Sequence, residues 1–592
     1  MLVLYARSLL IETHIREDKM MSRELFRVID PGYGKRNIFR FAAMITVSLG
    51  PVVVATIAKW LLPWLDAEVV SENNVSKKRG APLDDDGLID HIALQTRNRA
   101  TVVGISASIT NAVPRALRII ETYVGMSDDL RPKGIVVGGW HAGDDPEPFL
   151  RAGADVVVHG EGELIIAQLV EALATGKSLE EIPGISYFDG DELKRNLISN
   201  PAHRNLSQGQ ETFLAVPQSE IESMPDPDFG LVRFANIKLV PVSRTRGCTG
   251  RCKFCRVKGA ARYLSPERLV GQIQNGYSQG KRRFFVVDDR CEEDMIGFIA
   301  WLKLLVNWIE TNNIKGLDIS CQCRLSLAGF KPSRSSGIEL TGPEIMALMR
   351  RACINTVCIG FESPIKEELD AMSKPTKQSM MLEWAKTWKS FGFLVHAMMI
   401  FGYPIRNGRP LPRNAKGEVM TAAERAQAFW SFIKKAAPTY LQVLIYSPII
   451  GTDDRQWLEV DDRILSGIPL ELHDGLHVLY QPDAGSTPQE VQHEAINLSR
   501  RFYARRIAKF QWLALVCHSL KVASITCSMP FIWAAIMPLH GFRSRDAWQW
   551  PKRMKRVAIR HWGAQFIIVK FLKNLHPFER LLARVSHQGN SV

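Results

Sequence analysis

Three cysteines stand within eight positions of the chain, in the Gly- and Arg-rich stretch RTRGCTGRCKFCRVKG (244–259). Cys248, Cys252 and Cys255 have the spacing C-x3-C-x2-C, whereas the 592 residues contain only 10 cysteines in all. Thiolates select soft metals, namely iron–sulfur clusters, zinc or copper(I). Structural zinc takes four ligands, usually as two pairs, and no second pair lies nearby. The loop therefore indicates an iron–sulfur cluster with one iron open to a substrate or cofactor.

The loop also has an aromatic residue, Phe254, directly before its last cysteine. In this it resembles the cluster motif of the radical S-adenosylmethionine (SAM) superfamily. The resemblance implies that Cys248, Cys252 and Cys255 are the catalytic residues and hold a [4Fe–4S] cluster whose open iron binds SAM. Reduced by a donor such as flavodoxin or ferredoxin, the cluster would cleave SAM to methionine and a 5′-deoxyadenosyl radical, which takes hydrogen from an unactivated carbon.

The residues after the loop alternate helical patterns with short apolar runs, as parallel β/α units do. Strands are expected within 282–290, 316–324, 341–363 (after a capped helix), 391–404 and 439–453. Each expected strand ends in polar or glycine residues, and the C-terminal strand ends form the active edge of a barrel. The order resembles the radical SAM barrel, which implies a partial (β/α)6 TIM-like barrel over 241–460.

The strand ends DD, GFES, FGYP and SPIIGT, and the tripeptide MSK (372–374), have counterparts in that superfamily. The resemblance implies a SAM site made by Phe254, Asp288, Gln322, Arg324, Glu362 and Ser363. The remaining cysteines 291, 321, 323, 353 and 358 lie mostly on expected core strands. For these we expect buried free thiols rather than an auxiliary cluster.

Residues 36–200 are expected to form a second α/β domain. Strands are expected at 101–108, 133–142 and 154–163, and helices at 112–125 and 163–173. Such alternation makes a doubly wound, Rossmann-like sheet, whose ligands bind at the C-terminal strand ends. Those ends are rich in small residues.

The phrases GISAS, VVGGWHA and VVHGEGE, with the linker IESMPDPDF (221–229), resemble the cobalamin-binding domain that precedes the barrel in one large radical SAM class. The resemblance implies cobalamin contacts from Ser106, Ser108, Gly138, Gly139, Trp140, His141, Gly160, Glu161, Gly162 and Glu163. Small residues let the flat corrin and its nucleotide tail approach the backbone closely. The motif Asp-x-His-x-x-Gly is absent, so either cobalamin has no protein ligand from below or the domain binds none. His141 is more simply a loop histidine than a ligand.

An apolar run over 41–65 is long enough to span a membrane. Lys59 and two prolines weaken that interpretation. We favour a strand, a turn at Gly50–Pro51, a helix and a further strand, because the α/β pattern continues beyond it.

The C-terminal region 461–592 is predicted to be helical, with a helix at 484–510 and an apolar stretch at 511–539. From Arg501 onward there are 16 Lys and Arg but only two acidic residues, so this part carries the whole net charge of +14. Trp548, Trp550 and Trp562 interleave with a basic run, which is typical of a helix in a membrane interface. A helical cap over the barrel is the alternative. Nucleic-acid binding has less support, because no RNA module is present.

Composition is ordinary for a globular protein, and 592 residues require several domains. No signal peptide opens the chain, so we expect a cytoplasmic protein, peripheral at the inner face of the membrane if the tail binds lipid. The expected organisation is an N-terminal extension (1–35), a cobalamin-binding-like domain (36–200), a linker (201–240), the barrel (241–460) and the C-terminal region (461–592).

Together these features resemble the class B radical SAM methyltransferases. They imply an enzyme that methylates an unactivated carbon of a hydrophobic or lipid-like substrate. Three alternatives stay open: a rearrangement, cyclisation or coupling on the same architecture, a radical SAM enzyme without cobalamin, and a cobalamin or iron–sulfur sensor or scaffold without turnover.

Overall fold

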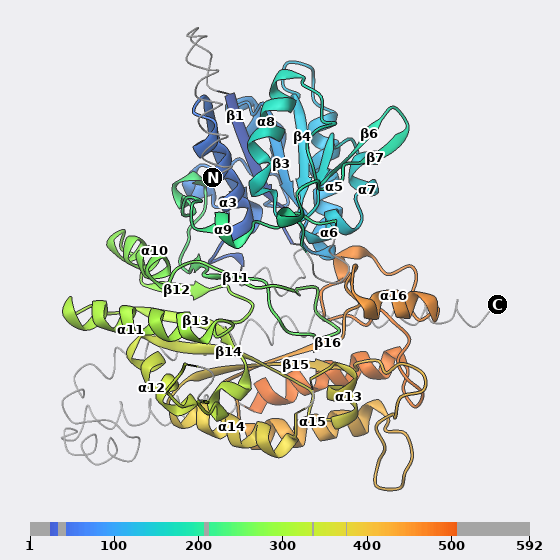
Figure 1. The fold of residues 1–592 in the computed structure, drawn as a ribbon. Helices are drawn as coiled ribbons and strands as arrows, with labels where there is room; N and C mark the ends of the chain where they lie inside the picture. The colour runs from blue at the N-terminus through green and yellow to red at the C-terminus, as the bar shows by residue number, and fades with distance from the viewer. Residues whose placement is uncertain are drawn as a thin grey trace, which may run out of the picture.

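The computed structural model describes residues 24–33, 43–205, 212–257, 259–333, 337–374 and 376–505. Figure 1 shows an N-terminal α/β domain stacked on a second α/β domain, with the ends of the described chain far from each other. The tail segments predicted at 511–539 and beyond, including the three tryptophans and the basic run, lie outside the described residues.

The N-terminal domain is built on one eight-stranded sheet of order β7-β6-β5-β4-β3-β1-β2-β8. Its strands are β1 Glu24–Asp30, β2 Leu65–Ser71, β3 Val102–Ser106, β4 Gly134–Gly138, β5 Val156–Val158, β6 Ile185–Asp189, β7 Glu192–Arg195 and β8 Val232–Arg233. All pairings are parallel except those of β5 with β6 and of β6 with β7. The doubly wound sheet predicted from the sequence is thus present.

The sheet draws on more of the chain than residues 36–200. Strand β1 comes from the predicted N-terminal extension and pairs with both β2 and β3, while β8 comes from the predicted linker. Strand β1 is hard to recognise because it carries Arg27, whose side chain is fully buried. The guanidinium donates to Glu68 and Gln95 at 2.6 Å each, which offsets the cost of burying its charge.

The helix predicted within the apolar run at 41–65 is present, and the predicted strand AEVV lies in β2. Gly50 and Pro51 belong to the helix itself and not to a turn before it. Helix α3 spans Leu49–Leu61 and places Pro51 in its first turn, where a missing N–H costs nothing. Residues 43–48 form no strand, so the strand expected before Gly50 is absent. Helix α3 packs on β1, β2 and helix α8 (Ile166–Thr175). Among the described residues, no helix has the length and apolarity needed to cross a bilayer.

The other helices of this domain lie on the two faces of the sheet. They are α4 His91–Arg97, α5 Val113–Val124, α6 Trp140–Asp144, α7 Glu147–Arg151 and α8. Figure 1 shows α3 and α8 on one side of the sheet and α5 on the other. Two separate buried clusters of apolar side chains correspond to these two faces.

The second domain is a six-stranded, all-parallel sheet of order β16-β15-β14-β13-β12-β9. Its strands are β9 Val240–Val242, β12 Arg283–Val286, β13 Asp318–Cys323, β14 Ile354–Glu362, β15 Leu394–Phe401 and β16 Tyr440–Ile445. They alternate with α10 Pro266–Ser278, α11 Met295–Thr311, α12 Gly342–Arg351, α13 Lys366–Ala371, α14 Gln378–Ser390 and α15 Ala422–Ala436. This is the partial barrel that the sequence predicted, and each expected strand contains an observed one.

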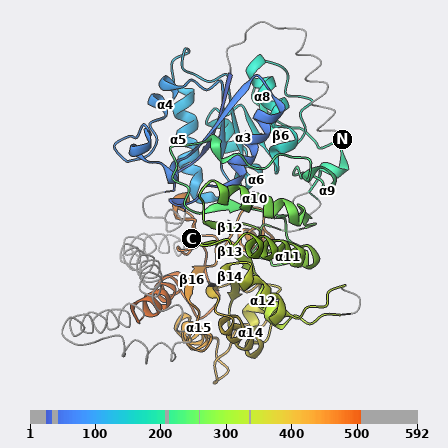
Figure 2. The ribbon, with the colours of Figure 1, turned by 90° about the vertical axis from the view of Figure 1, so that its left-hand side faces the viewer.

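A short hairpin brackets the cysteine loop. Strand β10, Thr245–Arg246, pairs antiparallel with β11, Arg262–Tyr263, so the residues between them leave and return at one place. The chain after the barrel forms α16 Asp453–Val460 and a helix over 488–505. Tyr503 anchors this last helix, because its hydroxyl bonds both backbone groups of Leu441 in β16. Figure 2 shows the two domains after a 90° turn about the vertical axis of Figure 1.

Candidate active site

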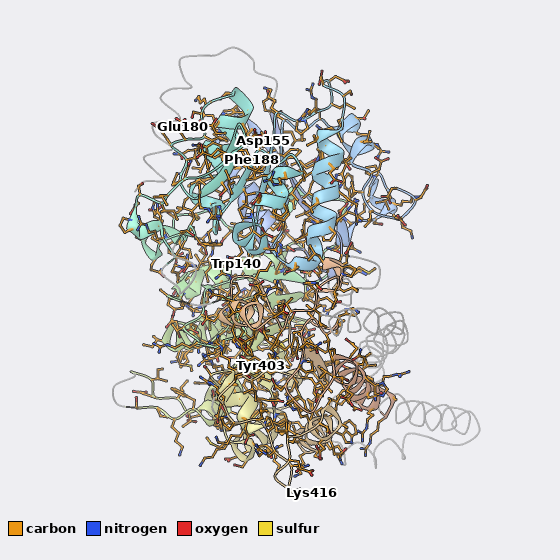
Figure 3. All side chains as sticks on the ribbon, turned by 90° about the vertical axis from the view of Figure 1, so that its right-hand side faces the viewer. Trp140, Asp155, Glu180, Phe188, Tyr403 and Lys416 are labelled. Atoms are coloured by element: carbon orange, nitrogen blue, oxygen red, sulfur yellow. The ribbon has the colours of Figure 1, made fainter. Side chains whose placement is uncertain are left out.

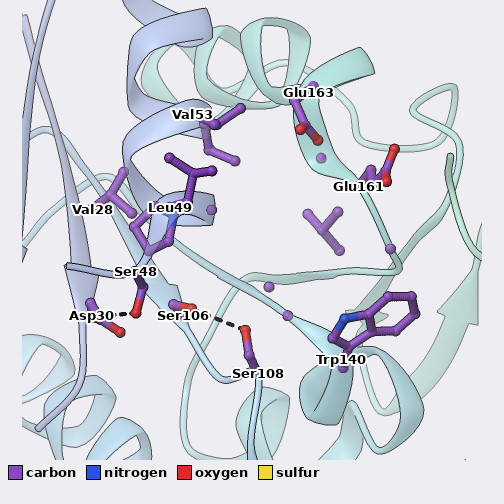
Figure 4. Close-up of a pocket in the computed structure, with 18 of the residues that line it drawn as sticks. Val28, Asp30, Ser48, Leu49, Val53, Ser106, Ser108, Trp140, Glu161 and Glu163 are labelled. Carbon is purple, nitrogen blue, oxygen red and sulfur yellow. Dashed lines mark hydrogen bonds between the residues drawn. The ribbon is translucent and has the colours of Figure 1, made fainter. Parts of the chain in front are cut away.

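A cavity of about 540 Å³ lies where the two sheets face each other. The C-terminal strand ends of the N-terminal sheet form one wall of it (Figure 4). The other wall comes from the barrel side: Ser243, Thr245, Arg246, Gly247, Val257, Arg262, Val287 and Asp289. Both domains therefore contribute to one cavity.

Nine of the ten residues predicted to contact cobalamin line this cavity: Ser106, Ser108, Gly138, Gly139, Trp140, Gly160, Glu161, Gly162 and Glu163. Two of the glycines are required by the backbone. Gly139 has φ +111°, and a Cβ there would lie 2.6 Å from Ser108 Oγ. Gly160 has φ +87°, and a Cβ there would lie 2.3 Å from the carbonyl oxygen of Leu214. These positions bring main chain, not side chain, to the cavity surface.

His141 is the exception. It is buried beside the cavity wall, and Nδ1 lies 3.1 Å from Thr110 Oγ1. Burial lowers the pKa of His141 to about 4, so its ring is neutral. No histidine occurs in the described lining of the cavity. The wall therefore fits a corrin held by shape and backbone, without a histidine ligand to cobalt.

Strand β1 adds an acidic residue that the sequence did not reveal. Asp30 lines the cavity and accepts hydrogen bonds from Ser48 (3.0 Å) and Ser71 (2.8 Å) (Figure 4). Burial raises the pKa of Asp30 above its ordinary value. The signal that could have found it is the end of a parallel strand, but β1 itself was not recognised.

The three cysteines of the loop share one site around Gly250. A Cβ placed on Gly250 would lie 3.2 Å from Cys248 Sγ and 3.9 Å from Cys252 Sγ. Burial, with smaller contributions from Asp289 and the other two sulfurs, raises the pKa of Cys255 to about 12. In the described parts of the chain, no three His, Cys, Asp or Glu side chains converge on one metal ion. The donor set fits a [4Fe–4S] cluster, because there each thiolate binds a different iron.

Three charged side chains gather at this loop. The Arg324 guanidinium lies 3.2 Å from the same Cβ position on Gly250, and Lys374 Nζ donates to Glu362 Oε1 at 2.5 Å. The pKa of Lys374 is raised above its ordinary value: burial and Arg324 lower it, but Glu362 and Cys252 raise it by more. Arg324 and Glu362 are predicted SAM residues. Lys374, in the tripeptide MSK, was not among the residues predicted to contact SAM, and the structure places it against Glu362.

The other predicted SAM residues have partners of their own. Asp288 accepts from Ser243 Oγ and from the backbone N–H of Arg244, both at 2.8 Å. It thereby anchors the strand that leads into the cysteine loop, and burial raises its pKa to about 7. Ser363 is fully buried and donates to Glu368.

Two predicted residues remain. Gln322 donates to the carbonyl oxygen of Asp289 at 2.8 Å, and Phe254 packs against the core. None of the six lines the cavity, whereas Asp289 does. Burial and the neighbouring Asp288 raise the pKa of Asp289 to about 6.

Three arginines around the cysteines pair with three acidic residues of the N-terminal domain. Arg246 bonds Glu163 at 2.6 Å, Arg262 bonds Glu161 at 2.7 Å, and Arg256 bonds Asp144 at 2.6 Å. Two of the predicted cobalamin contacts, Glu161 and Glu163, are therefore occupied by ion pairs. The sequence did not show these pairs, because their members stand far apart in the chain.

The remaining cysteines are mostly core residues, as predicted. Cys291, Cys321 and Cys323 are at most 3 % exposed, while Cys353 and Cys358 are partly buried.

Two protein families match the chain, one for each domain. Residues 79–170 match the B12 binding domain, and residues 242–413 match the radical SAM superfamily. The matched segments contain, respectively, the strand ends that line the cavity and the cysteine loop with its barrel.

Relatives with the same arrangement are distant. An uncharacterised methyltransferase of Pyrococcus horikoshii is 25% identical over 363 residues, which cover 60% of this chain and 68% of the relative. The hopanoid C-2 methylase of Rhodopseudomonas palustris is 26% identical over 199 residues, 33% of this chain and 35% of the methylase. The chain thus spans about a third of the length of the second relative.

Two solved structures share the fold. The cobalamin-dependent SAM radical enzyme OxsB, with aqua-cobalamin bound, has a TM-score of 0.58 at 13% identity, covering 97% of this chain and 81% of OxsB. The radical SAM methyltransferase TsrM from Kitasatospora setae, with cobalamin and a [4Fe–4S] cluster bound, has a TM-score of 0.54 at 16% identity, covering 75% of this chain and 78% of TsrM.

The cofactors of the chain follow from its two domains: a [4Fe–4S] cluster with SAM for the barrel, and cobalamin for the N-terminal domain. Three observations support this assignment: the cavity between the strand ends of both domains, the cysteine trio and the two family matches. The chain is an enzyme in which a B12-binding domain precedes a radical SAM domain.

Proposed function

We propose that this chain is a cobalamin-dependent methyltransferase that methylates an unactivated carbon of a hydrophobic substrate. One observation carries the proposal: a single cavity is walled by the B12-binding strand ends on one side and by the cysteine hairpin on the other. A substrate carbon that loses hydrogen to one cofactor and receives a methyl group through the other must reach both.

When bound, the cluster with SAM supplies the radical that removes hydrogen, and cobalamin carries the methyl group. The residues of the chain position these groups. A Cβ on Gly138 would meet nothing closer than 3.9 Å, so this position would leave room for a flat ring close to the main chain, whereas Gly139 and Gly160 let the neighbouring loops pack closely. Glu362 offers a carboxylate to the amino group of SAM, and Arg324 and Lys374 offer cations to its carboxylate.

The walls of the cavity favour an apolar substrate. Aliphatic side chains from both domains line it: Val28, Leu49, Val53, Val54, Ile109, Val136, Val158, Ile166, Val257 and Val287. Apolar pockets with few polar groups are typical of sites for hydrophobic ligands. One relative is a hopanoid methylase and two others are anaerobic magnesium-protoporphyrin IX monomethyl ester cyclases, which supports a polycyclic terpenoid or a tetrapyrrole before an acyl chain.

The reaction is tested with the reconstituted full chain, a low-potential reductant and SAM that carries a deuterated methyl group. Hopanoid, acyl-lipid and tetrapyrrole substrates are supplied separately. The proposal expects 5′-deoxyadenosine together with one labelled methyl group in a lipid product. 5′-Deoxyadenosine with an unlabelled, altered product would instead assign a rearrangement or cyclisation. Bound cofactors without any 5′-deoxyadenosine, with every substrate, would assign a sensor.

We also propose that the C-terminal tail binds an anionic membrane surface. Its Trp residues and the basic run Lys552–Arg560 support this. Co-sedimentation with anionic vesicles is expected for the full chain and is expected to fall several-fold when Lys552, Arg553, Lys555 and Arg556 are changed to Glu. Equal sedimentation of both proteins would contradict it.

A further inference from the structure

Arg256 directly follows the third cluster cysteine, and its side chain enters the B12-binding domain. Its Nε donates to Asp144 Oδ2 at 3.0 Å, and its Nη2 donates to Asp144 Oδ1 at 2.6 Å. Both side chains are only 7% exposed. Two parallel bonds between a guanidinium and a carboxylate fix direction as well as distance. The residue next to Cys255 is therefore held by a side chain of the neighbouring domain.

Two aromatic rings complete the enclosure of this guanidinium. It lies 5.3 Å from the ring centre of Trp140 and 5.1 Å from that of Phe213, both within range of a cation–π contact. The two rings stack on each other at 5.9 Å. Figure 3 shows Trp140 where the two domains meet. Trp140 also lines the cavity, so one side chain contacts both Arg256 and the cobalamin site.

The barrel closes the enclosure from a third side. Gly451, in the turn after the last barrel strand β16, has φ +76°, and a Cβ there would lie 2.6 Å from both Arg256 Nε and Asp144 Oδ2. Only glycine leaves room for the ion pair at this position. Arg256, Asp144 and Gly451 thus bring the cysteine loop, the B12-binding domain and the barrel to one point.

We propose that Arg256 couples the two cofactor sites, so that the cluster and cobalamin each strengthen the binding of the other. A cluster fixes the position of Cys255 and therefore of Arg256. A bound corrin fixes the wall that contains Trp140, on the other side of the same guanidinium. Each cofactor then orders part of the site that the other requires, so the second cofactor binds with a smaller loss of conformational entropy. Coupling of binding free energies is reciprocal, so the effect must appear in both directions.

The test measures the Kd for hydroxocobalamin by equilibrium dialysis, with the full chain either cluster-loaded or iron-free. We expect the cluster to lower Kd at least about fivefold, the lower end of ordinary coupling. In Arg256→Ala, Kd is expected to be the same with and without the cluster. In the reverse direction, hydroxocobalamin should slow the loss of iron to a chelator in the parent chain and not in the variant.

Matched variants separate coupling from folding. Arg351→Ala removes an exposed ion pair with Glu310 on the barrel surface and should keep the full coupling. Arg256→Lys keeps the charge without the paired bonds and should restore coupling in part. If Arg256→Ala does not fold, Asp144→Asn takes its place, with the same expected loss.

Equal Kd values in the two forms of the parent chain would overturn the proposal. So would coupling that survives in both Arg256→Ala and Asp144→Asn. The measurement uses neither SAM nor substrate, so its outcome is independent of the proposed methyl transfer.

Discussion

The two walls of the cavity differ in how they present chemistry. On the B12-binding side, nine of ten residues inferred from sequence line the cavity, and most of them are glycine or serine. On the barrel side, none of the six inferred SAM residues lines it, and they are larger, mostly polar or charged side chains. One wall offers shape and backbone, and the other offers the charged side chains of Arg246, Arg262 and Asp289.

The difference shows what a sequence motif can locate. A glycine lies where its strand ends, so recognising the strand is enough to place it. A polar or charged side chain extends several ångströms from its strand, so its position depends on which nearby group it bonds. The Asp288 carboxylate accepts a hydrogen bond from Ser243, and the Ser363 hydroxyl donates one to Glu368. Glu362, in contrast, accepts from Lys374 beside the cysteines.

The largest expected effect comes from removing a thiolate on the barrel side. Cys252→Ala leaves the cluster with two ligands, so iron should fall from about four per chain to near zero. 5′-Deoxyadenosine formation should fall to the level of an iron-free sample. Cys353→Ala, at a partly buried cysteine outside the trio, should keep its iron. A Cys252→Ala protein that retained iron would contradict the assignment of the trio.

The matching change on the other wall fills the cavity. A Cβ on Gly138 would have no neighbour closer than 3.9 Å, so Gly138→Leu meets no protein atom closely but occupies space needed by the corrin. Overpacking costs about 1–3 kcal/mol, which predicts a Kd for hydroxocobalamin raised about fivefold or more with the cluster intact. Gly271→Leu, at an open position on α10, is the control. Unchanged cobalamin affinity in Gly138→Leu would place the corrin elsewhere.

A smaller effect is expected from the carboxylate beside the cysteines. Glu362→Gln keeps the size of the side chain but removes its charge, and a hydrogen bond to a charged group contributes about 1.5–3 kcal/mol. SAM affinity, measured by isothermal titration with the cluster-loaded chain, should fall about tenfold or more. Glu367→Gln, on the adjacent helix α13, should have no effect. An equal loss in both variants would show that the charge acts only at long range.

The smallest effect concerns Asp288, which supports the loop without lining the cavity. Its pKa rises from an ordinary 3.8 to about 7 on folding, so the folded chain binds an extra proton between these values. Stability should therefore fall as pH rises from about 4 to about 7. Asp288→Asn keeps the oxygen that accepts both bonds, and should flatten this slope and raise Tm at pH 8 by about 2–4 °C. Parallel pH profiles of Tm in both proteins would contradict the assignment of the extra proton to Asp288.

Local patterns were sufficient for most of the fold. Five of the six barrel strands and helix α12 with its capping box were predicted because their apolar periods and caps agree, whereas the three-residue strand β9 was not predicted. Strand β1 was missed because the buried Arg27 interrupts its apolar pattern, and its partners Glu68 and Gln95 are remote in sequence. The same reason hides the pair of Arg256 and Asp144, which are 112 residues apart. Burial of a charge is visible only when its partner is known.

The central claim is that cobalamin and the cluster face each other across one cavity. It is tested most directly by electron paramagnetic resonance on the full chain loaded with both cofactors, with cobalt as cobalt(II) and the cluster reduced by one electron. The account predicts that the two signals broaden or split each other. In Gly138→Leu, which displaces the corrin, the cluster signal should show neither broadening nor splitting. A spectrum that is the simple sum of two isolated signals would contradict it.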